Sequence, residues 1–247
     1  ILPLVSDVDP NRLSPADRLT PPSSDFWLGT DDLGRDVLIR AIAGVRVSLM
    51  VGVSIMVVST LLGSLLGLLS GYYQRLDIPI MRVMDGIMAF PAILLAIAIM
   101  ASLGRSTVNV VIALSVVYVP IIARLVRGST LSVQNQMYVE AAHSIGVRGW
   151  AILLRHIFPN VLSPLIVQAT FIVALAIIAE ASLSFLGAGV DPATPTWGAM
   201  LRDGQRVIQQ AWWMVLVPSV FLFLTVLSLN LVGDGLRDAL DPRARER

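Results

Sequence analysis

The chain has 247 residues, of which 55% are hydrophobic and only 14% are charged, and its mean hydropathy is +0.77. In soluble domains about a quarter of the residues are charged, so this composition indicates a membrane protein and excludes an ordinary soluble globule. The chain has no cysteine and no lysine, and its net charge is +1; it therefore lacks disulfides, thiolate metal ligands, a phosphate-binding loop of the G-x-x-x-x-G-K-[ST] type and a basic field for nucleic acid.

The N-terminal segment, residues 1–30, has the composition of an external linker. Its first five residues are apolar and begin with Ile1 rather than methionine, so we expect that a first span preceding this segment is missing and that the intact subunit has six spans. Residues 7–25 are polar and contain four prolines, which resist regular structure. Acidic residues then offer a helix cap, and we expect an interfacial helix over residues 31–46.

Five stretches lack charged residues for long enough to cross the hydrocarbon core of a bilayer, which takes about 20 apolar residues in a helix. They are residues 47–74, 86–104, 106–123, 157–179 and 207–233. The sequence therefore predicts an all-α, polytopic membrane domain over residues 47–233.

Glycine and proline predict how these spans pack and bend. Gly63, Gly67 and Gly71 form two overlapping G-x-x-x-G steps in the first span, and we expect them to pack against another helix of this chain. Proline removes a backbone donor, so each proline inside a span predicts a kink; these are Pro91, Pro120 and Pro218.

Arginine is shared unevenly between the two sets of connecting loops. The segments that follow the first, third and fifth spans hold ten arginines, whereas the other set, the N-terminal segment aside, holds three. Because cytoplasmic loops near span ends retain positive charge, we expect the loop 124–160 and the tail 234–247 to be cytoplasmic. The loop 185–211 is then external.

The cytoplasmic loop has a pattern that a mere connection does not need. Tyr138, Ala141, Ala142 and Ile145 follow the spacing i, i+3, i+4, i+7, which predicts an apolar helical face of largely small residues. Gly146 comes where such a helix would end. We expect this face to contact another protein.

A second apolar set repeats that spacing and ends before a proline. Its members are Trp150, Leu153, Leu154 and Ile157, and Pro159 follows. The loop is thus predicted to form a helix, a glycine turn and a second helix. We expect the second helix to fold back onto the ends of the membrane helices, since tryptophan and leucine suit a membrane interface.

Glu180 is the one acid well inside an apolar context, near the outer end of the fourth span. An ionisable group in a span commonly marks a pathway or a partner, so Glu180 is a candidate for the translocation cavity or the outer gate. A carboxylate that caps a helix break with Ser182 and Ser184 is the alternative. The sequence leaves both open.

Beyond Glu180, the outer loop is rich in glycine and proline and contains Trp197, Met200 and Leu201. This pattern predicts turns followed by a short interfacial helix, which either anchors the chain in the interface or contacts a partner. The pair Trp212–Trp213 is predicted to anchor the chain at the membrane interface.

The loop at Glu140 resembles the EAA motif of binding-protein-dependent ABC import permeases. Glu140, Ala141 and Ala142 form the triplet, Gly146 follows six residues after the glutamate and Pro159 nineteen after it. Two positions depart from the general pattern, His156 where the family often has isoleucine and Phe158 where it often has leucine. The surrounding sequence resembles the C-type subunit of the dipeptide and oligopeptide branch, in the segments 28–36, 146–150, 154–160, 184–190 and 195–201.

The resemblance implies a non-catalytic permease subunit of the bacterial inner membrane. It would form the path for dipeptides or oligopeptides with a second permease, bind two ATPase subunits below and receive peptide from an external binding protein. No cofactor is expected in this chain, since ATP and Mg²⁺ would bind to the ATPase subunits. The alternatives are a nickel or glutathione importer and, in a different class, an ion-coupled secondary transporter, for which Glu180 is the only support.

The resemblance also implies roles for single residues. The motif carries ATPase coupling, and we expect that role for Glu140, Ala141, Ala142, Ser144, Ile145, Gly146 and Pro159. The outer loop with Trp197, Met200 and Leu201 would lie beside the docked binding protein. Two histidines without cysteine or an H-E-x-x-H motif predict no metal site.

Overall fold

The computed structural model describes residues 9–240 and is all-helical over that range, in which Thr30 and Asp36 form an isolated bridge and no strand occurs. The expectations for the apolar residues 1–5 and for the arginines within 241–247 lie outside the described residues.

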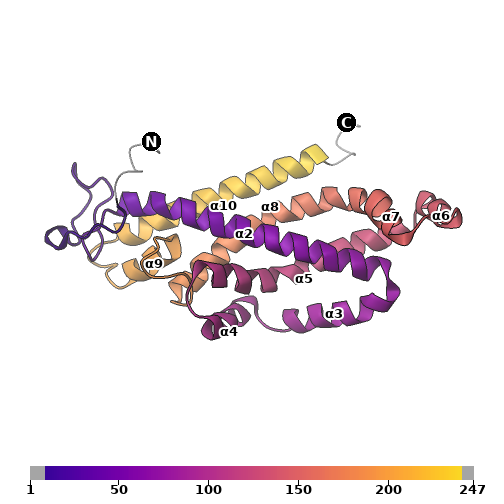
Figure 1. Cartoon of the computed structure of the whole chain (residues 1–247). Helices are drawn as coiled ribbons and strands as arrows, with labels where there is room; N and C mark the ends of the chain where they lie inside the picture. The colour runs from indigo at the N-terminus through magenta and orange to yellow at the C-terminus, as the bar shows by residue number, and fades with distance from the viewer. Residues whose placement is uncertain (1–8, 241–247) are drawn as a thin grey trace.

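Four long helices form the bundle (Figure 1): α2 (Val37–Tyr72), α5 (Thr107–Gln134), α8 (Phe158–Phe185) and α10 (Trp213–Leu240). The shorter elements are the 3₁₀ turn η1 (Pro15–Asp17), α3 (Gln74–Met88), α4 (Ala92–Leu103), α6 (Met137–Ser144), α7 (Gly149–Ile152), the π-helical turn η2 (Leu153–Ile157) and α9 (Trp197–Gln205). By length and composition, the four long helices can each cross a membrane, and α3 with α4 meet the same test only as a bent pair, which is either a broken span or a re-entrant loop. This agrees with the predicted polytopic all-α fold.

The bundle has two distinct ends (Figure 1). The N-terminal linker and α9 lie at one end, which we call the α9 end, and α6 with α7 lie at the other, the α6 end. The two segments that the sequence assigns to opposite sides of the membrane, 124–160 and 185–211, thus lie far apart.

Helix α2 combines most of the predicted interfacial helix with the predicted first span in one continuous helix. The side chain of Asp36 accepts hydrogen bonds from the backbone N–H groups of Leu38 and Ile39, at 2.8 and 3.1 Å, and so caps the helix. From Val37 the helix continues for 36 residues. The separate interfacial helix expected over 31–46 is not present, because residues 31–36 form a turn and the rest belongs to α2.

The glycine stripe of α2 packs against α5, as predicted. A Cβ atom built on Gly63 would lie 2.6 Å from Cβ of Ile122, and one on Gly67 would lie 2.6 Å from the carbonyl oxygen of Ala123. A Cβ atom on Gly71 would be equally close to Thr130. Such distances leave no room for a methyl group, so the glycines set how closely the two backbones approach.

Proline 91 produces a break rather than the predicted kink. Helix α3 ends at Met88, α4 begins at Ala92, and the two axes differ by 91°. Pro91 has no N–H to continue the ladder, and the chain instead tightens, with Phe90 N–H donating to the Ile87 carbonyl at 3.4 Å. By contrast, α5 and α10 continue past Pro120 and Pro218.

Candidate functional site

Helix α6 and the turn after it form the most distinctive feature of the α6 end. The helix begins after Gln136, whose backbone is extended, and ends at Ser144, with Ile145 as its C-cap. Gly146 follows with φ = +79°, in the left-handed region that favours glycine. Helix α7 begins three residues later, so the predicted helix, glycine turn and second helix are all found.

One face of α6 packs on the chain and the other is exposed. Val139 and Ala142 are buried, whereas Ala141 is exposed and the side chains of Met137 and Ile145 are 86% and 81% exposed. Ala142 was predicted to belong to the contact face, but it lies on the buried side of α6 with Val139.

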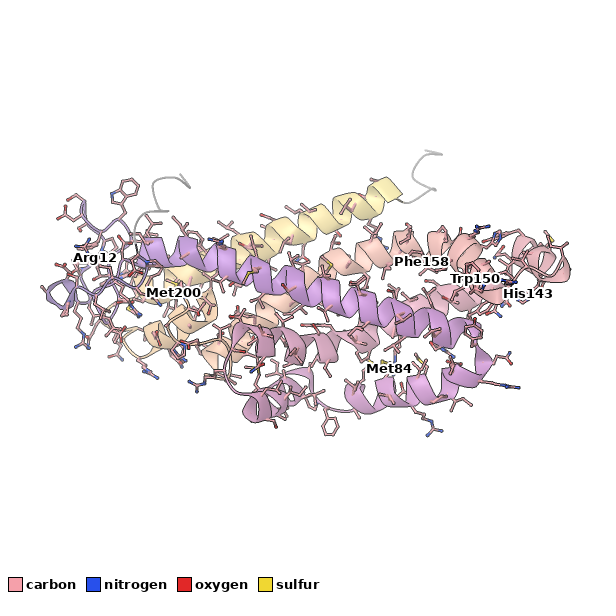
Figure 2. All side chains as sticks on the ribbon, viewed as in Figure 1. Arg12, Met84, His143, Trp150, Phe158 and Met200 are labelled. Atoms are coloured by element: carbon pink, nitrogen blue, oxygen red, sulfur yellow. The ribbon has the colours of Figure 1, made fainter. Side chains whose placement is uncertain are left out.

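The second helix is only partly folded back. Leu153 and Ile157 are buried as expected, but Trp150 and Leu154 are exposed. Together with α6 they leave exposed apolar side chains at the α6 end, which we call the coupling surface: Met137, Tyr138, Ile145, Trp150 and Leu154. Figure 2 shows Trp150 and His143 at this end. Gathered apolar side chains of this kind are typical of a surface that binds another protein.

Hydrogen bonding ties α6 to the end of α2. His143 Nε2 lies 3.1 Å from the hydroxyl oxygen of Tyr72, and the two rings stack with centroids 6.2 Å apart. Gly149 packs against the same tyrosine, since a Cβ atom there would lie 3.1 Å from its hydroxyl oxygen. No contact of His143 was predicted from the sequence, and this hydrogen bond joins α6 to the end of α2.

The remaining motif residues lie around this turn. Glu140 has an exposed side chain, and its carbonyl oxygen accepts a hydrogen bond of 3.0 Å from the Ser144 hydroxyl. Pro159 is exposed in the first turn of α8, directly after η2. A proline in the first turn of a helix sacrifices no hydrogen bond within that helix, so the π-helical turn and Pro159 together mark where the loop becomes a span.

Glu180 is buried between two helices at the α9 end of the bundle. Its side chain is fully buried and accepts hydrogen bonds from the hydroxyls of Ser184, at 2.7 Å, and Ser48, at 3.4 Å. Helix α8 continues to Phe185, and Ser182 donates to the Ile178 carbonyl instead. Glu180 therefore joins α8 to α2 in this conformation, and it does not cap a helix break because α8 is continuous there. A role at the outer gate stays a prediction.

The outer residues predicted to touch a binding protein are mostly buried. Trp197 is fully buried, and its Nε1 donates to the Ala41 carbonyl at 3.0 Å; Met200 is buried as well. Leu201 is partly exposed. The structure thus contradicts a contact role for Trp197 and Met200 in this conformation, because both side chains fill the core beneath α9.

The tryptophan pair that was predicted to anchor the chain is divided. Trp212 is exposed, whereas Trp213 is buried and its Nε1 donates to the Thr30 carbonyl at 3.1 Å. Only Trp212 has the exposure that an interface anchor needs. A buried indole N–H needs a hydrogen-bond acceptor. For Trp213 the acceptor belongs to a turn that is distant in the sequence, so the local pattern did not reveal its burial.

The linker at the α9 end is ordered by charge pairs. Asp31 accepts from Arg35 Nε at 2.6 Å and lies 3.6 Å from Arg40 Nε. Burial raises the pKa of the Asp32 carboxyl, and the nearby carboxylates of Asp31 and Asp203 raise that pKa further. Within residues 9–240 no group of acids and histidines could hold a metal ion.

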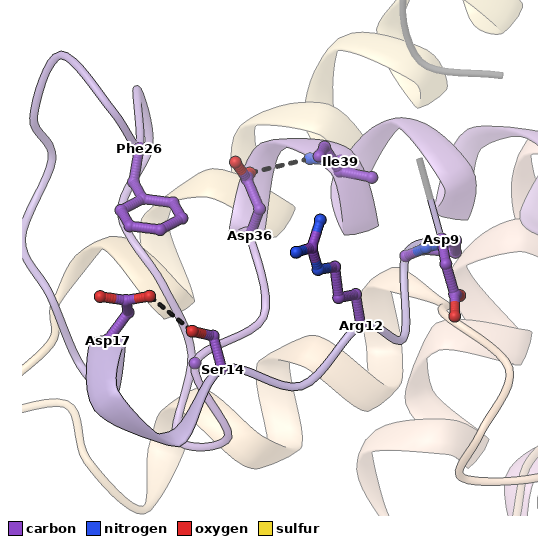
Figure 3. A pocket seen from close by; sticks show the side chains of 9 residues that line it. Asp9, Arg12, Ser14, Asp17, Phe26, Asp36 and Ile39 are labelled. Atoms are coloured by element: carbon purple, nitrogen blue, oxygen red, sulfur yellow. Dashed lines mark hydrogen bonds between the residues drawn. The ribbon is translucent and has the colours of Figure 1, made fainter. Parts of the chain in front are cut away.

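Next to this network the linker encloses a cavity of 280 Å³ (Figure 3), lined among others by Arg12, Asp17 and Asp36. Asp17 accepts a hydrogen bond of 2.5 Å from Ser14, and Asp36 caps α2. Asp9, the third carboxylate of the lining, accepts a hydrogen bond of 2.9 Å from the backbone N–H of Asn11, so all three carboxylates are engaged within the linker and the start of α2.

Two ion pairs between α3 and α5 were not predicted. Arg124 Nη2 lies 2.5 Å from Asp85 Oδ1, and Arg127 binds Asp77 through two contacts of 2.5 and 2.7 Å. The charges after the first span were expected in a loop. Their helical spacing, with Arg75, Arg82 and Asp85 at i, i+7 and i+10, is the signal that predicts one polar face.

A bundle of long apolar helices with a helical loop at one end defines a multi-pass membrane protein. The profile of the family described as binding-protein-dependent transport system inner membrane component matches residues 59–246, and the chain belongs to that family. The description is that of a transport component, which agrees with the resemblance found at Glu140, Gly146 and Pro159.

Curated relatives cover nearly the whole chain. A putative peptide transport system permease protein of Brucella suis is 44% identical over 99% of this chain and 83% of its own length. A dipeptide transport system permease protein of Alkalihalophilus pseudofirmus is 45% identical over 98% and 80%. A glutathione transport system permease protein of Pectobacterium atrosepticum is 47% identical over 91% and 75%.

Solved structures support the fold. An inward-facing methionine ABC transporter matches with a TM-score of 0.69 and 19% identity, over 83% of this chain and 96% of that chain. An amino acid ABC transporter matches with a TM-score of 0.63 and 16% identity, over 81% and 94%. The bundle is therefore the fold of ABC importer permeases.

Proposed function

We propose that this chain is a permease subunit of an ATP-driven importer for dipeptides and short peptides, and that it forms the translocation path with a second permease. The observation that carries the proposal is the coupling surface, an exposed apolar end on a helix that bears the EAA motif. The names of the relatives support the peptide substrate, since glutathione is itself peptide-like.

The partners follow from the two ends of the bundle. Two ATPase subunits, which bind ATP and Mg²⁺, would contact the coupling surface on the cytoplasmic side, and a substrate-binding protein would dock at the α9 end outside. The excess of arginine in the segments after the first, third and fifth spans supports this orientation. It also makes the C-terminal tail cytoplasmic.

Energy reaches the membrane helices by differential binding. If the two states of the ATPase dimer bind α6 differently, the permease equilibrium shifts by that difference in free energy, and this chain needs no catalytic group. Helix α6 packs on α5 and α7, and its His143 is hydrogen-bonded to Tyr72 at the end of α2, so a displacement of α6 would act on all three helices. Glu180, on which an ion-coupled mechanism would depend, instead forms internal hydrogen bonds.

Charge reversal at Glu140 tests the proposal. We expect Glu140→Lys to reduce uptake of a labelled dipeptide on the order of tenfold or more, since each ~1.4 kcal/mol of lost binding is a factor of ten. The exposed side chain lets the variant fold and insert normally, which immunoblotting of membranes checks.

Asp25→Lys is the matched control, because Asp25 is equally exposed but lies in the linker at the α9 end. It should retain the ATPase subunits on co-purification, whereas Glu140→Lys should lose them. Normal uptake by Glu140→Lys would remove the assignment of α6 as the coupling helix.

A further inference from the structure

A polar cavity lies at the α6 end, between α6 and the ends of the long helices. It has a volume of 540 Å³ and is lined by Tyr72, Tyr73, Gln74, Arg75, Gln134, His143 and Gly149. These residues come from the end of α2, the start of α3, the end of α5, and from α6 and α7; Figure 2 labels His143 at this end. None of the five residues of the coupling surface lines the cavity, so the two features are separate.

The charge of the lining is positive. Arg75 is exposed and forms no ion pair with the residues that the structure describes, and the lining contains no carboxylate. Asp77, the acid that follows Arg75 on α3, is held by Arg127 through two contacts of 2.5 and 2.7 Å. Arg148, also exposed, directly precedes Gly149 of the lining. The cavity therefore favours an anion.

Hydrogen-bonding groups surround the guanidinium. The hydroxyl of Tyr72 and Nε2 of His143 lie 3.1 Å apart at one wall. Gln134 forms another part of the wall, and its side-chain oxygen is enclosed without a hydrogen-bond partner in the part of the chain that the structure describes. An arginine fork among further polar groups is the arrangement that recognises a phosphate group.

The position of Arg75 also points to a phosphate ester. Arg75 is the first charged residue after the charge-free stretch 47–74, and the two tyrosines before it are of the kind that lies at the level of lipid headgroups. On α3, Leu76 and Ile78 are 40% and 69% exposed. Basic pockets between helices on the cytoplasmic side of a membrane bind anionic headgroups, and the volume exceeds what a bare phosphate needs.

We propose that this cavity binds a phosphate ester, with Arg75 as its main ligand. The anionic headgroup of a phospholipid and a soluble phosphate ester share this chemistry. Because the cavity includes His143 of α6 together with the ends of α2 and α5, an occupant would join α6 to the membrane helices. Binding does not rest on the proposed function; its effect on transport does.

The binding test uses the assembled transporter in an uncharged detergent and two probes, dioctanoyl phosphatidylglycerol and glycerol 3-phosphate, with bound ligand counted by native mass spectrometry. We expect Arg75→Gln to raise the Kd of the lipid about fivefold or more, which is the contribution of one arginine at an anionic membrane surface. Arg82→Gln is the matched control, because Arg82 is exposed on the same helix but outside the cavity, and it should bind like the parent.

The soluble probe separates the two sources of phosphate. Lipid binding that glycerol 3-phosphate in excess does not reduce assigns the site to a headgroup, whereas competition assigns it to a soluble ester. Equal Kd values for the parent and Arg75→Gln with both probes would overturn the proposal, as would equal losses in Arg75→Gln and Arg82→Gln. An Arg75→Gln chain that loses the ATPase subunits but keeps its affinity for both probes would show that an acidic side chain of the ATPase fills the cavity, and would also overturn it.

Transport gives the second readout. In phosphatidylcholine liposomes, a rising fraction of phosphatidylglycerol should increase dipeptide uptake by the parent and by Arg82→Gln, and have less effect on Arg75→Gln. A parent chain that binds the probe but takes up no dipeptide would count against the proposed function and leave the phosphate site standing.

Discussion

Gly146 determines the shape of the coupling loop. Its φ of +79° costs residues with a side chain about 1–2 kcal/mol, and no atom would crowd a Cβ there. The glycine is required by the backbone turn and not by packing. Its place after an apolar helical face was readable from the sequence, because helix ends of this kind are a local feature.

Other residues could not be placed from local sequence. Trp197 and Trp213 resemble interface anchors in a turn-rich segment, yet both are buried and donate to the carbonyls of Ala41 and Thr30. Those acceptors lie more than 150 residues away. Burial that depends on such distant partners leaves no pattern within the segment itself.

Asp32 gives a prediction at the residue scale. Its pKa is raised in the folded chain by burial and by neighbouring carboxylates, so the folded state favours the protonated form. The stability that this preference contributes is present at low pH and is lost as pH rises through the folded pKa. We expect Asp32→Asn to be more stable than the parent at pH 7.

The measurement is thermal unfolding in detergent across a pH series. The advantage of Asp32→Asn should shrink as pH falls toward the ordinary pKa of aspartate. Asp25→Asn is the control, because Asp25 is exposed. An advantage of Asp32→Asn that does not vary with pH would contradict the burial of a charged carboxylate.

At the scale of elements, the glycine stripe of α2 fixes its contact with α5. A methyl group at Gly67 would lie 2.6 Å from the Ala123 carbonyl oxygen, a backbone atom that cannot rotate away. We expect Gly67→Ala to destabilise the chain by about 1–3 kcal/mol through overpacking. Melting in detergent measures the effect.

Gly86→Ala is the matched control for this contact. Gly86 is also helical, but a Cβ atom there meets nothing within 4 Å, so alanine should stabilise by up to about 1 kcal/mol through helix propensity. Equal melting temperatures for Gly67→Ala and Gly86→Ala would show that the close approach of α2 and α5 is not a constraint.

Elements were predictable to the extent that their signals are local. Apolar stretches located the spans, and glycine spacing predicted the packing of α2 on α5. The break at Pro91 was predicted only as a kink, because proline alone does not fix the angle. The extension of α5 to Gln134 was missed, since its arginines pair with acids on α3 that a linear reading treats as loop.

At the scale of the whole molecule, the proposed function depends on two unlike ends. The linker and α9 form a capped end held by Asp31, Arg35 and Arg40, whereas the α6 end exposes apolar side chains. Arginine counts predicted this polarity from sequence.

The most direct test is co-purification of this chain, a second permease and the ATPase subunits in detergent, with ATP hydrolysis measured upon adding binding protein and dipeptide. We expect a stimulated complex with the parent chain and loss of the ATPase subunits with Gly146→Trp. Gly104→Trp is the control, because Gly104 also has a positive φ and open space but lies between α4 and α5, and it should retain them. A Gly146→Trp chain that binds the ATPase subunits and supports stimulated hydrolysis would contradict coupling through α6.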